Sequence, residues 1–128
     1  NYSGDFPFLW DEITVPIKTI SDYAYAKTLF YNILIEQVGA FSDSSQKAWD
    51  KMIGIYKIEN ARVQPMVSMV FDENWITFNL RYVVDYKSRR ATKTILFDKI
   101  LTAIKNSGER IKVASTAIEV TAFPSPTT

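Results

Sequence analysis

The chain has 128 residues, of which 47% are hydrophobic, and its formal net charge is +1 at pH 7. This size and composition predict one domain that buries roughly two-thirds of the surface exposed by its unfolded chain. Cys and His are both absent, which excludes disulfides, zinc sites built on these residues, and Ser-His-Asp or Cys-His catalysis. We therefore expect no catalytic, cofactor-binding or metal site, and predict that the protein is not an enzyme.

The two ends of the chain are predicted to lie outside the domain. Residues 1–10 combine Gly, Pro and aromatic residues, and we interpret them as a strand end followed by a connector. Residues 11–123 form the predicted domain, and the Pro-rich residues 124–128 are typical of a linker or disordered tail. Because the chain begins with Asn1 rather than Met, we expect a soluble piece of a longer protein.

A strand and a long helical segment come first. Residues 12–20 alternate apolar and polar side chains, which predicts a strand. Residues 21–22 are typical of a helix N-cap, and apolar residues at helical spacing predict a helix over 22–38 that stops at Gly39. The residues 42–45, which are Ser and Asp, would cap a second helix. A bent helical pair and one continuous rod both fit this pattern.

The longest strand signal lies within residues 74–90. Its side chains alternate, so one apolar face can lie against the helices while the other face stays open. A shorter alternation over residues 63–71, followed by the turn residues 72–74, predicts a hairpin. The predicted buried face holds Ile76, Phe78, Leu80, Tyr82, Val84 and Tyr86, and the predicted open face holds Trp75, Thr77, Asn79, Arg81, Val83 and Asp85.

The rest of the chain predicts a helix and a final strand. Apolar residues at helical spacing from Ile95 to Ile104 predict a helix that Ser88 caps and residues 107–108 end. Residues 110–122 return to an extended pattern. The order strand, helix pair, strand, strand, helix, strand predicts an α+β fold. We expect a ferredoxin-like split βαββαβ sandwich, an antiparallel sheet with its helices on one face.

Three side chains on the predicted open face are candidates for a subunit interface, namely Trp75, Arg81 and Val83. Aromatic residues and Arg are favoured where a partner buries part of an open surface. We therefore expect the partners of this chain to be copies of itself. For Arg81 an alternative stays open, which is a cross-strand pair with a carboxylate such as Glu119.

A basic run at the start of the last predicted helix has two interpretations. Cations at a helix N-terminus are disfavoured by a few tenths of a kcal/mol each. The run is either a solvated turn balanced by Asp85 and Asp98, or a site that attracts an anion, an acidic neighbouring subunit or permeating anions. The residues of this candidate anion or portal site are Lys87, Arg89, Arg90 and Lys93.

The paired acids Asp11-Glu12 and Asp72-Glu73 do not form an acid-base pair by themselves. Neighbouring residues of an extended chain point to opposite sides, so two adjacent carboxylates cannot act together on one substrate. We expect turn formation and solvation to account for them. No GxGxxG or Walker A pattern is present, which argues against nucleotide binding by such loops.

Residues 63–67, 74–90 and 111–120 together resemble the cytosolic C-terminal domain of the small-conductance mechanosensitive ion channel family. The most specific part is Leu80-Arg81-Tyr82-Val83 followed by the basic turn. The opening Asn-Tyr-Ser is similar to the exit from that family's middle β domain, which implies that residues 1–10 end a preceding β domain.

The resemblance implies part of a prokaryotic channel that opens under membrane tension during hypo-osmotic shock. It implies a place on the cytoplasmic side of the inner membrane, with pore helices upstream of this chain. Copies of the domain, seven in typical members, would build a vestibule with portals that filter solutes. The implied partners are therefore further copies of the chain, with no nucleic acid.

Two other functions stay open. A ferredoxin-like nucleic-acid or ligand-binding module would stack bases on aromatic residues of the central strand, although the open face offers only Trp75 and the chain has no RNP1-like run. A small enzyme of the same fold would use Arg81 and Asn79 on an anionic substrate.

Overall fold

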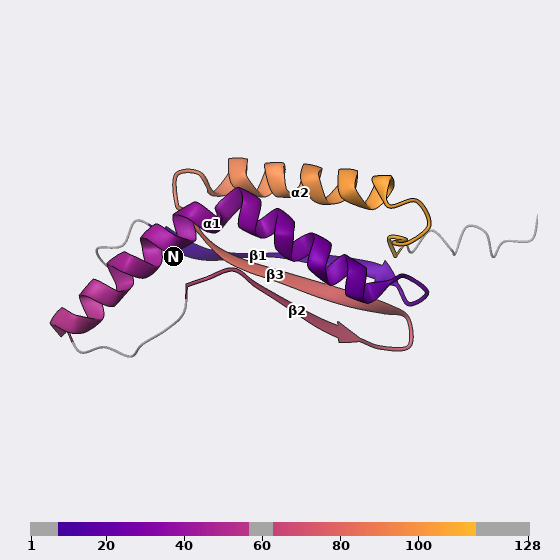
Figure 1. The fold of residues 1–128 in the computed structure, drawn as a ribbon, viewed down its shortest axis with the longest axis horizontal. Coiled ribbons are helices and arrows are strands. Elements are labelled where there is room, and N and C mark those ends of the chain that lie inside the picture. The colour runs from indigo at the N-terminus through magenta and orange to yellow at the C-terminus, as the bar shows by residue number, and fades with distance from the viewer. Residues whose placement is uncertain (1–7, 57–62, 115–128) are drawn as a thin grey trace, which may run out of the picture.

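The computed structural model describes residues 8–56 and 63–114, which form three strands and two helices. Both helices lie on the same side of the sheet (Figure 1). No helix in the described part of the chain is long and apolar enough to cross a membrane. The elements in chain order are β1 (Phe8–Lys18), α1 (Tyr23–Tyr56), β2 (Met66–Phe71), β3 (Trp75–Asp85) and α2 (Arg89–Asn106).

The three strands form an antiparallel sheet in the order β1-β3-β2, so the predicted central strand is central. Its register places Ile13 of β1 and Val67 of β2 on either side of Leu80. The predicted hairpin between β2 and β3 is confirmed. Its turn is held by Asp72, whose Oδ1 accepts hydrogen bonds from the backbone N–H groups of Asn74 at 2.8 Å and Trp75 at 3.1 Å.

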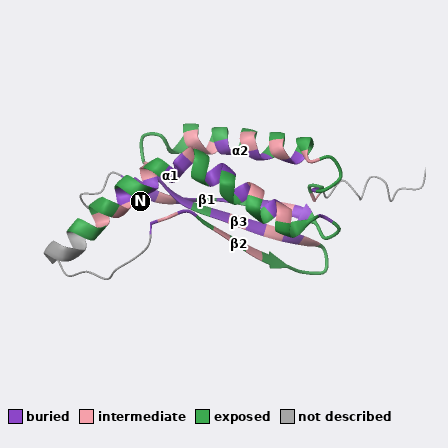
Figure 2. Ribbon diagram, viewed as in Figure 1, coloured by how far each residue is buried: buried purple, intermediate pink, exposed green. Residues whose placement is uncertain are grey.

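The core lies between the helices and one face of the sheet, as the alternation of β3 predicts (Figure 2). Phe78 is fully buried and meets Phe30 of α1 edge to face, with 5.2 Å between ring centroids. Tyr86 departs from the prediction, because it follows the end of β3 and is exposed. The apolar side chains that β3 and the helices contribute to this core are Ile76, Phe78, Leu80, Tyr82, Val84, Ala26, Phe30, Ile33, Leu34, Val38, Leu96, Ile100 and Ile104.

The helical segment is one continuous helix rather than two, so the predicted stop at Gly39 and the predicted cap at residues 42–45 are wrong. A Ser inside a helix is tolerated when its hydroxyl bonds the carbonyl four residues earlier, which also tends to bend the helix. Ser44 does so, with its Oγ donating to the carbonyl oxygen of Ala40 at 3.3 Å. Figure 1 shows that α1 changes direction along its length.

The last predicted strand appears among the described residues only as its beginning. Val113 forms an antiparallel bridge to Ile17 at the outer edge of β1. The N–H of Ala114 donates to the carbonyl oxygen of Pro16 at 3.1 Å. The remainder of the predicted strand, up to residue 122, lies outside the described residues, as do residues 124–128. The fold is therefore α+β with three antiparallel strands and two helices, and not the full predicted βαββαβ topology.

Val83 is fully buried, so its predicted place on an open face is wrong. It belongs to a second apolar cluster with Phe8 of β1 and Val63, which comes just before β2. Phe41 and Trp49 from the second half of α1 pack against this cluster. The outer face of the sheet is consequently covered near the end of β3, because α1 continues past the point at which a shorter helix would have stopped.

Two neighbouring residues of β3 allow a direct test of this layering. Replacing the fully buried Phe78 by Ala should lower the free energy of unfolding by about 3 to 5 kcal/mol, since it leaves a cavity in the core. Replacing Thr77 by Ala, on the opposite side of the strand, should cost less than about 1 kcal/mol. Urea unfolding followed by circular dichroism measures both values, and equal losses would contradict the one-sided core.

Candidate functional site

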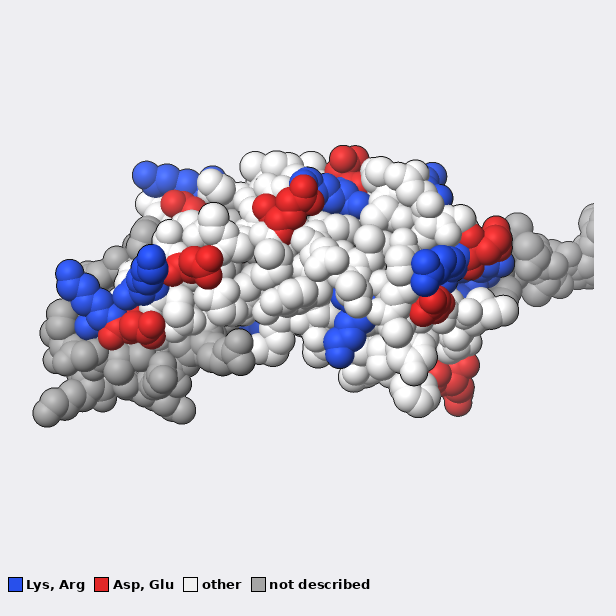
Figure 3. Space-filling view, viewed as in Figure 1, with Lys and Arg blue, Asp and Glu red and all other residues white. Residues whose placement is uncertain are grey.

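The four basic residues of the predicted anion site do come together at the start of α2. They line one cavity with Tyr86, and its volume is about 480 Å³. Figure 3 shows Lys or Arg atoms beside an acidic side chain at the upper left, near the loop that leads from β3 into α2. The turn before the helix is closed by Asp85, whose carbonyl oxygen accepts the Ser88 N–H at 2.8 Å and whose Oδ1 accepts the Lys87 N–H at 2.8 Å.

Asp11 of β1 is the acidic partner of this cluster, and it is only 5% exposed. Its Oδ2 lies 3.3 Å from Arg89 Nε and its Oδ1 lies 3.1 Å from Lys93 Nζ. The Tyr82 hydroxyl donates to Asp11 Oδ2 at 3.3 Å. The ion pairs of the basic turn are thus made to Asp11, and among the described residues neither Asp85 nor Asp98 forms an ion pair with it.

Sequence reasoning missed the role of Asp11, although a signal was present. Asp11 shares its parity in β1 with Ile13 and Val15, so it points toward the core side, while Glu12 points away. A carboxylate on a buried parity needs a positively charged or hydrogen-bonding partner. Extending the first strand backward by a few residues would have placed Asp11 inside it and raised the question of that partner.

The environment of Asp11 stabilises its charged form. Burial alone would raise the pKa of the Asp11 carboxyl, but hydrogen bonds from Arg89, Lys93 and the Glu12 N–H together outweigh burial and hold that pKa below its usual value. The pKa of the neighbouring Tyr82 hydroxyl is raised, first by burial and then by the negative charge of Asp11. Asp11 is therefore a carboxylate, and Tyr82 a neutral donor, across the ordinary pH range.

Two cations of the cluster keep free binding capacity. Arg90 is exposed and makes no ion pair with any residue of the described ranges. Lys87 is also exposed, and its ammonium lies 5.8 Å from the centre of the Tyr86 ring. Ser88 makes no side-chain cap hydrogen bond and the first turn of α2 has no acidic residue, so the first amides of this helix lack an internal acceptor. This arrangement is suited to attract an anion.

The other candidate surface, on the outer face of the sheet, is only partly as predicted. Arg81 is exposed, and the central carbon of its guanidinium lies 4.4 Å from the centre of the Trp10 ring. Trp75 is half-buried and sits about 20 Å along the same strand from Arg81. The proposed partner Glu119 lies outside the described residues. Of the three predicted interface residues, Arg81 is freely accessible, Trp75 partly so, and Val83 not at all.

Polar side chains of β1 and β3 lie beside Arg81, and Glu12 is its register partner in β1. Asn79 donates from its Nδ2 to Glu12 Oε1 at 2.7 Å across the β1 and β3 pair.

Within residues 8–56 and 63–114 no group of three or more acidic residues could hold a metal ion. The chain matches no family model, and it matches no curated protein.

The charge of Asp11 gives the first test of this site. Since the folded-state pKa of Asp11 is lowered, the unfolded state binds more protons in the acid range, and the stabilisation it provides is complete above its unfolded value near 3.8. That stabilisation is lost as pH falls through the folded-state pKa. Changing Asp11 to Asn should lower stability at pH 7 by about 1 to 3 kcal/mol and flatten the acid limb of a stability profile. An unchanged acid limb in urea titrations would contradict this assignment.

The different roles of Arg89, which pairs with Asp11, and Arg90, which is accessible, give a second test. Changing Arg90 to Ala should weaken the binding of inorganic phosphate by roughly threefold to tenfold, because a freely accessible cation is lost. The melting temperature should change little. Changing Arg89 to Ala should lower the melting temperature, because Asp11 loses a partner. Calorimetric titration measures the affinity, with Lys105→Ala at the far end of α2 as the matched control. Equal phosphate binding by Arg90→Ala and Lys105→Ala would discard the anion site.

Proposed function

We propose that this chain is a vestibule-forming cytoplasmic domain of a tension-gated channel similar to the small-conductance mechanosensitive family. The fold supports the proposal in its order of elements and in the placement of α2 and the first half of α1 on one side of the sheet. The segment at Val113 pairs with the free edge of β1, which is the position of the last strand in a ferredoxin-like βαββαβ sandwich. The membrane-spanning helices of such a channel would lie upstream of Asn1.

The observation that carries the proposal is the accessible Arg81 on the side of the sheet opposite the helices. Stacking on Trp10 restricts the guanidinium, so less conformational entropy is lost when a partner binds it. Arg and aromatic residues in this combination are frequent centres of protein interfaces. A face of this kind suits side-by-side assembly of identical subunits into a closed ring, for which seven copies are the expected number.

In such a ring the basic cluster would act on solutes. The accessible Lys87 and Arg90, beside the free amides of α2, would raise the local concentration of anions near a portal. The cluster needs no catalytic group for this role. The domain would therefore contribute both to assembly and to filtering, on the cytoplasmic side of the inner membrane.

A second candidate function is favoured by one observation. The cavity at the start of α2 combines two accessible cations with free amides, which is also what a module binding a small anionic ligand requires. Base stacking is less favoured, because Arg81 covers the Trp10 ring and Trp75 is half-buried. Filter binding with single-stranded RNA separates the nucleic-acid module from the channel domain, and salt-sensitive binding would support the module.

Assembly through the sheet provides the test. Changing Arg81 to Glu should weaken self-association at least tenfold, or about 1.4 kcal/mol. The substitution removes a cation that anchors the interface and leaves in its place a negative charge without a partner, or one that repels an acidic residue of the neighbouring subunit. Light scattering on the chain measures its mass as a function of concentration. Lys47→Glu, an equal charge change on the exposed side of α1, is the control. Identical masses for both variants and the parent would refute assembly through this face.

A further inference from the structure

The outer edge of β2 is unoccupied by any described segment. The sheet order places β2 at one edge and β1 at the other. The edge of β1 is covered near its end by residues 112–114, through hydrogen bonds that include Lys18 N–H to the carbonyl oxygen of Lys112 at 2.7 Å. Among residues 8–56 and 63–114, nothing pairs with β2 on the side away from β3. The edge at β1 thus already pairs with an extended segment, and the edge at β2 is free to pair with another one.

The register of the hairpin identifies the free backbone groups. The N–H of Asp72 donates to the carbonyl oxygen of Trp75 at 3.1 Å, so these two residues form a hydrogen-bonded pair. Hydrogen-bonded and non-hydrogen-bonded pairs alternate along an antiparallel ladder. The even-numbered residues of β2 therefore bond β3, while Val67, Met69 and Phe71 direct their N–H and C=O groups outward. These groups can bond an added strand without disturbing the existing ladder.

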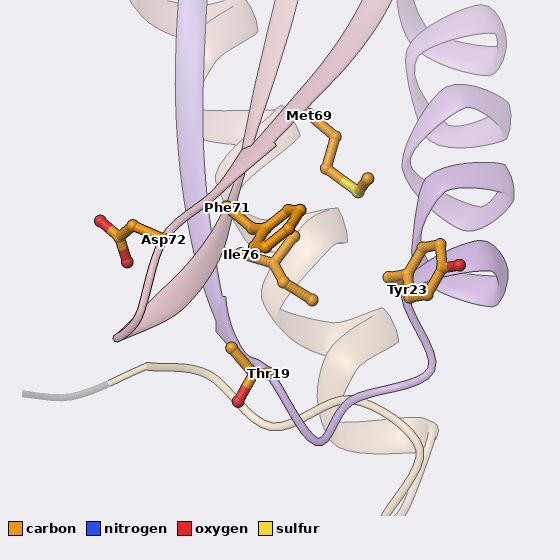
Figure 4. A pocket seen from close by; sticks show the side chains of 6 residues that line it. All are labelled: Thr19, Tyr23, Met69, Phe71, Asp72 and Ile76. Carbon is orange, nitrogen blue, oxygen red and sulfur yellow. The ribbon is translucent and has the colours of Figure 1, made fainter.

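The same edge borders an apolar groove against the first half of α1. One cavity of about 460 Å³ lies between Tyr23 of α1 and Met69 and Phe71 of β2. Figure 4 shows the Met69 and Phe71 side chains on the side that faces Tyr23. A second cavity of about 410 Å³ lies further along the same two elements, with Tyr31 on the helix and Val67 on the strand. The groove can therefore take the side chains of an extended segment at two places.

The strand lacks the features that usually protect a sheet edge. Natural edge strands carry charged residues, bulges or Pro that discourage pairing. β2 has the sequence MVSMVF, with no charge, and Val70 is 67% exposed and Phe71 74% exposed. The surface over β2 is largely uncharged in Figure 3 as well. We therefore expect a binding partner to cover the edge of β2 in the functional protein.

Two charged residues line the groove. Asp72 borders the first cavity, and Figure 4 shows its carboxylate directed away from Tyr23. Lys27 is the charge that faces the second cavity, and it indicates what covers the groove. Lys27 lies one helical turn from both Tyr23 and Tyr31 and lines the second cavity. It is exposed and makes no ion pair with any residue of the described part. A bound segment that is apolar at both ends and acidic in the middle would complement this wall.

We propose that the groove between α1 and β2 binds an extended, acidic segment of another protein by strand addition to β2. Backbone hydrogen bonds to Val67, Met69 and Phe71 would hold the segment, as in other complexes formed by strand addition. Alternate apolar side chains would enter the two cavities, and a carboxylate between them would pair with Lys27. This inference is independent of the proposed channel function, because it uses neither the outer face of the sheet nor the basic cluster.

A second copy of this chain fits the groove less well. Pairing two β2 strands about a two-fold axis would place the two α1 helices antiparallel across the seam. Lys27 lines a cavity with Met66 and Val67, which places it within about two residues of the middle of β2. The Lys27 side chains of the two copies would then face each other, and like charges so placed repel.

Reversing the charge at residue 27 and at the centre of a bound peptide tests the proposal. The probe is a fluorescent heptapeptide that alternates threonine and valine, with its central valine replaced by glutamate, and the comparison peptide carries lysine there. The parent chain should bind the glutamate peptide at least tenfold more tightly, and Lys27→Glu should reverse the preference. Lys47→Glu, elsewhere on α1, should leave it unchanged. Equal binding of the two peptides by the parent chain would overturn the proposal.

Amide exchange locates the bound peptide without any change to the chain. Saturating glutamate peptide should slow exchange of the Val67, Met69 and Phe71 amides at least tenfold and leave those of α2 unaffected. Protection confined to other residues would overturn strand addition. Light scattering provides the last outcome, because a dimer that forms without peptide and dissociates in Val70→Lys would show that a second copy occupies the groove instead.

Discussion

The constraint on which this structure depends is the burial of one face of β3 along its whole length, while its other face is buried only at Val83. This strand bonds β1 and β2 on its two edges, so its register fixes theirs. Its even-numbered side chains hold both helices, and a slip of one residue would move Phe78, Leu80 and Tyr82 out of the core. Each surface of interest lies at a fixed place relative to this strand. The basic cluster follows its end, the Arg81 surface occupies its other face, and β2 forms the free edge beside it.

Asp11 couples the sheet to the start of α2 and explains how that helix tolerates so many cations. A helix N-terminus favours anions, and α2 instead begins with Arg89 and Arg90 and carries Lys93 just after its first turn. The buried carboxylate of Asp11 offsets this unfavourable placement by pairing with two of them. Arg90 remains unpaired within the described part of the chain. The cluster is thereby divided into a structural half, which fixes the helix on the sheet, and an accessible half, which can bind a solute.

Much of this fold could be predicted from local patterns, and the errors have physical causes. Alternation in β3, turn chemistry at Asp72 and the bounds of α2 depend on neighbouring residues, so the sequence alone indicated them. The continuity of α1 through Gly39 did not follow, because tertiary packing and the Ser44 hydrogen bond override local stop signals. Val83 was misplaced for the same reason, since only a helix that continues can cover it. The pairing of Asp11 with Arg89 joins residues far apart in the chain, which periodicity does not report.

The Arg81 face and the edge of β2 have different physical characters, and this argues for different partners. The outer face near Arg81 offers side chains but no free backbone groups, so it can meet another folded subunit through shape and charge alone. The edge of β2 offers both, and a backbone ladder tolerates many sequences as long as the partner is extended. An uncharged edge of this kind also pairs indiscriminately with other strands when left open. Lys27 restricts that choice, because it penalises a cationic or identical partner while leaving the ladder intact. A ring built through the Arg81 face would leave the β2 groove available, so assembly and peptide binding need not compete for the same surface.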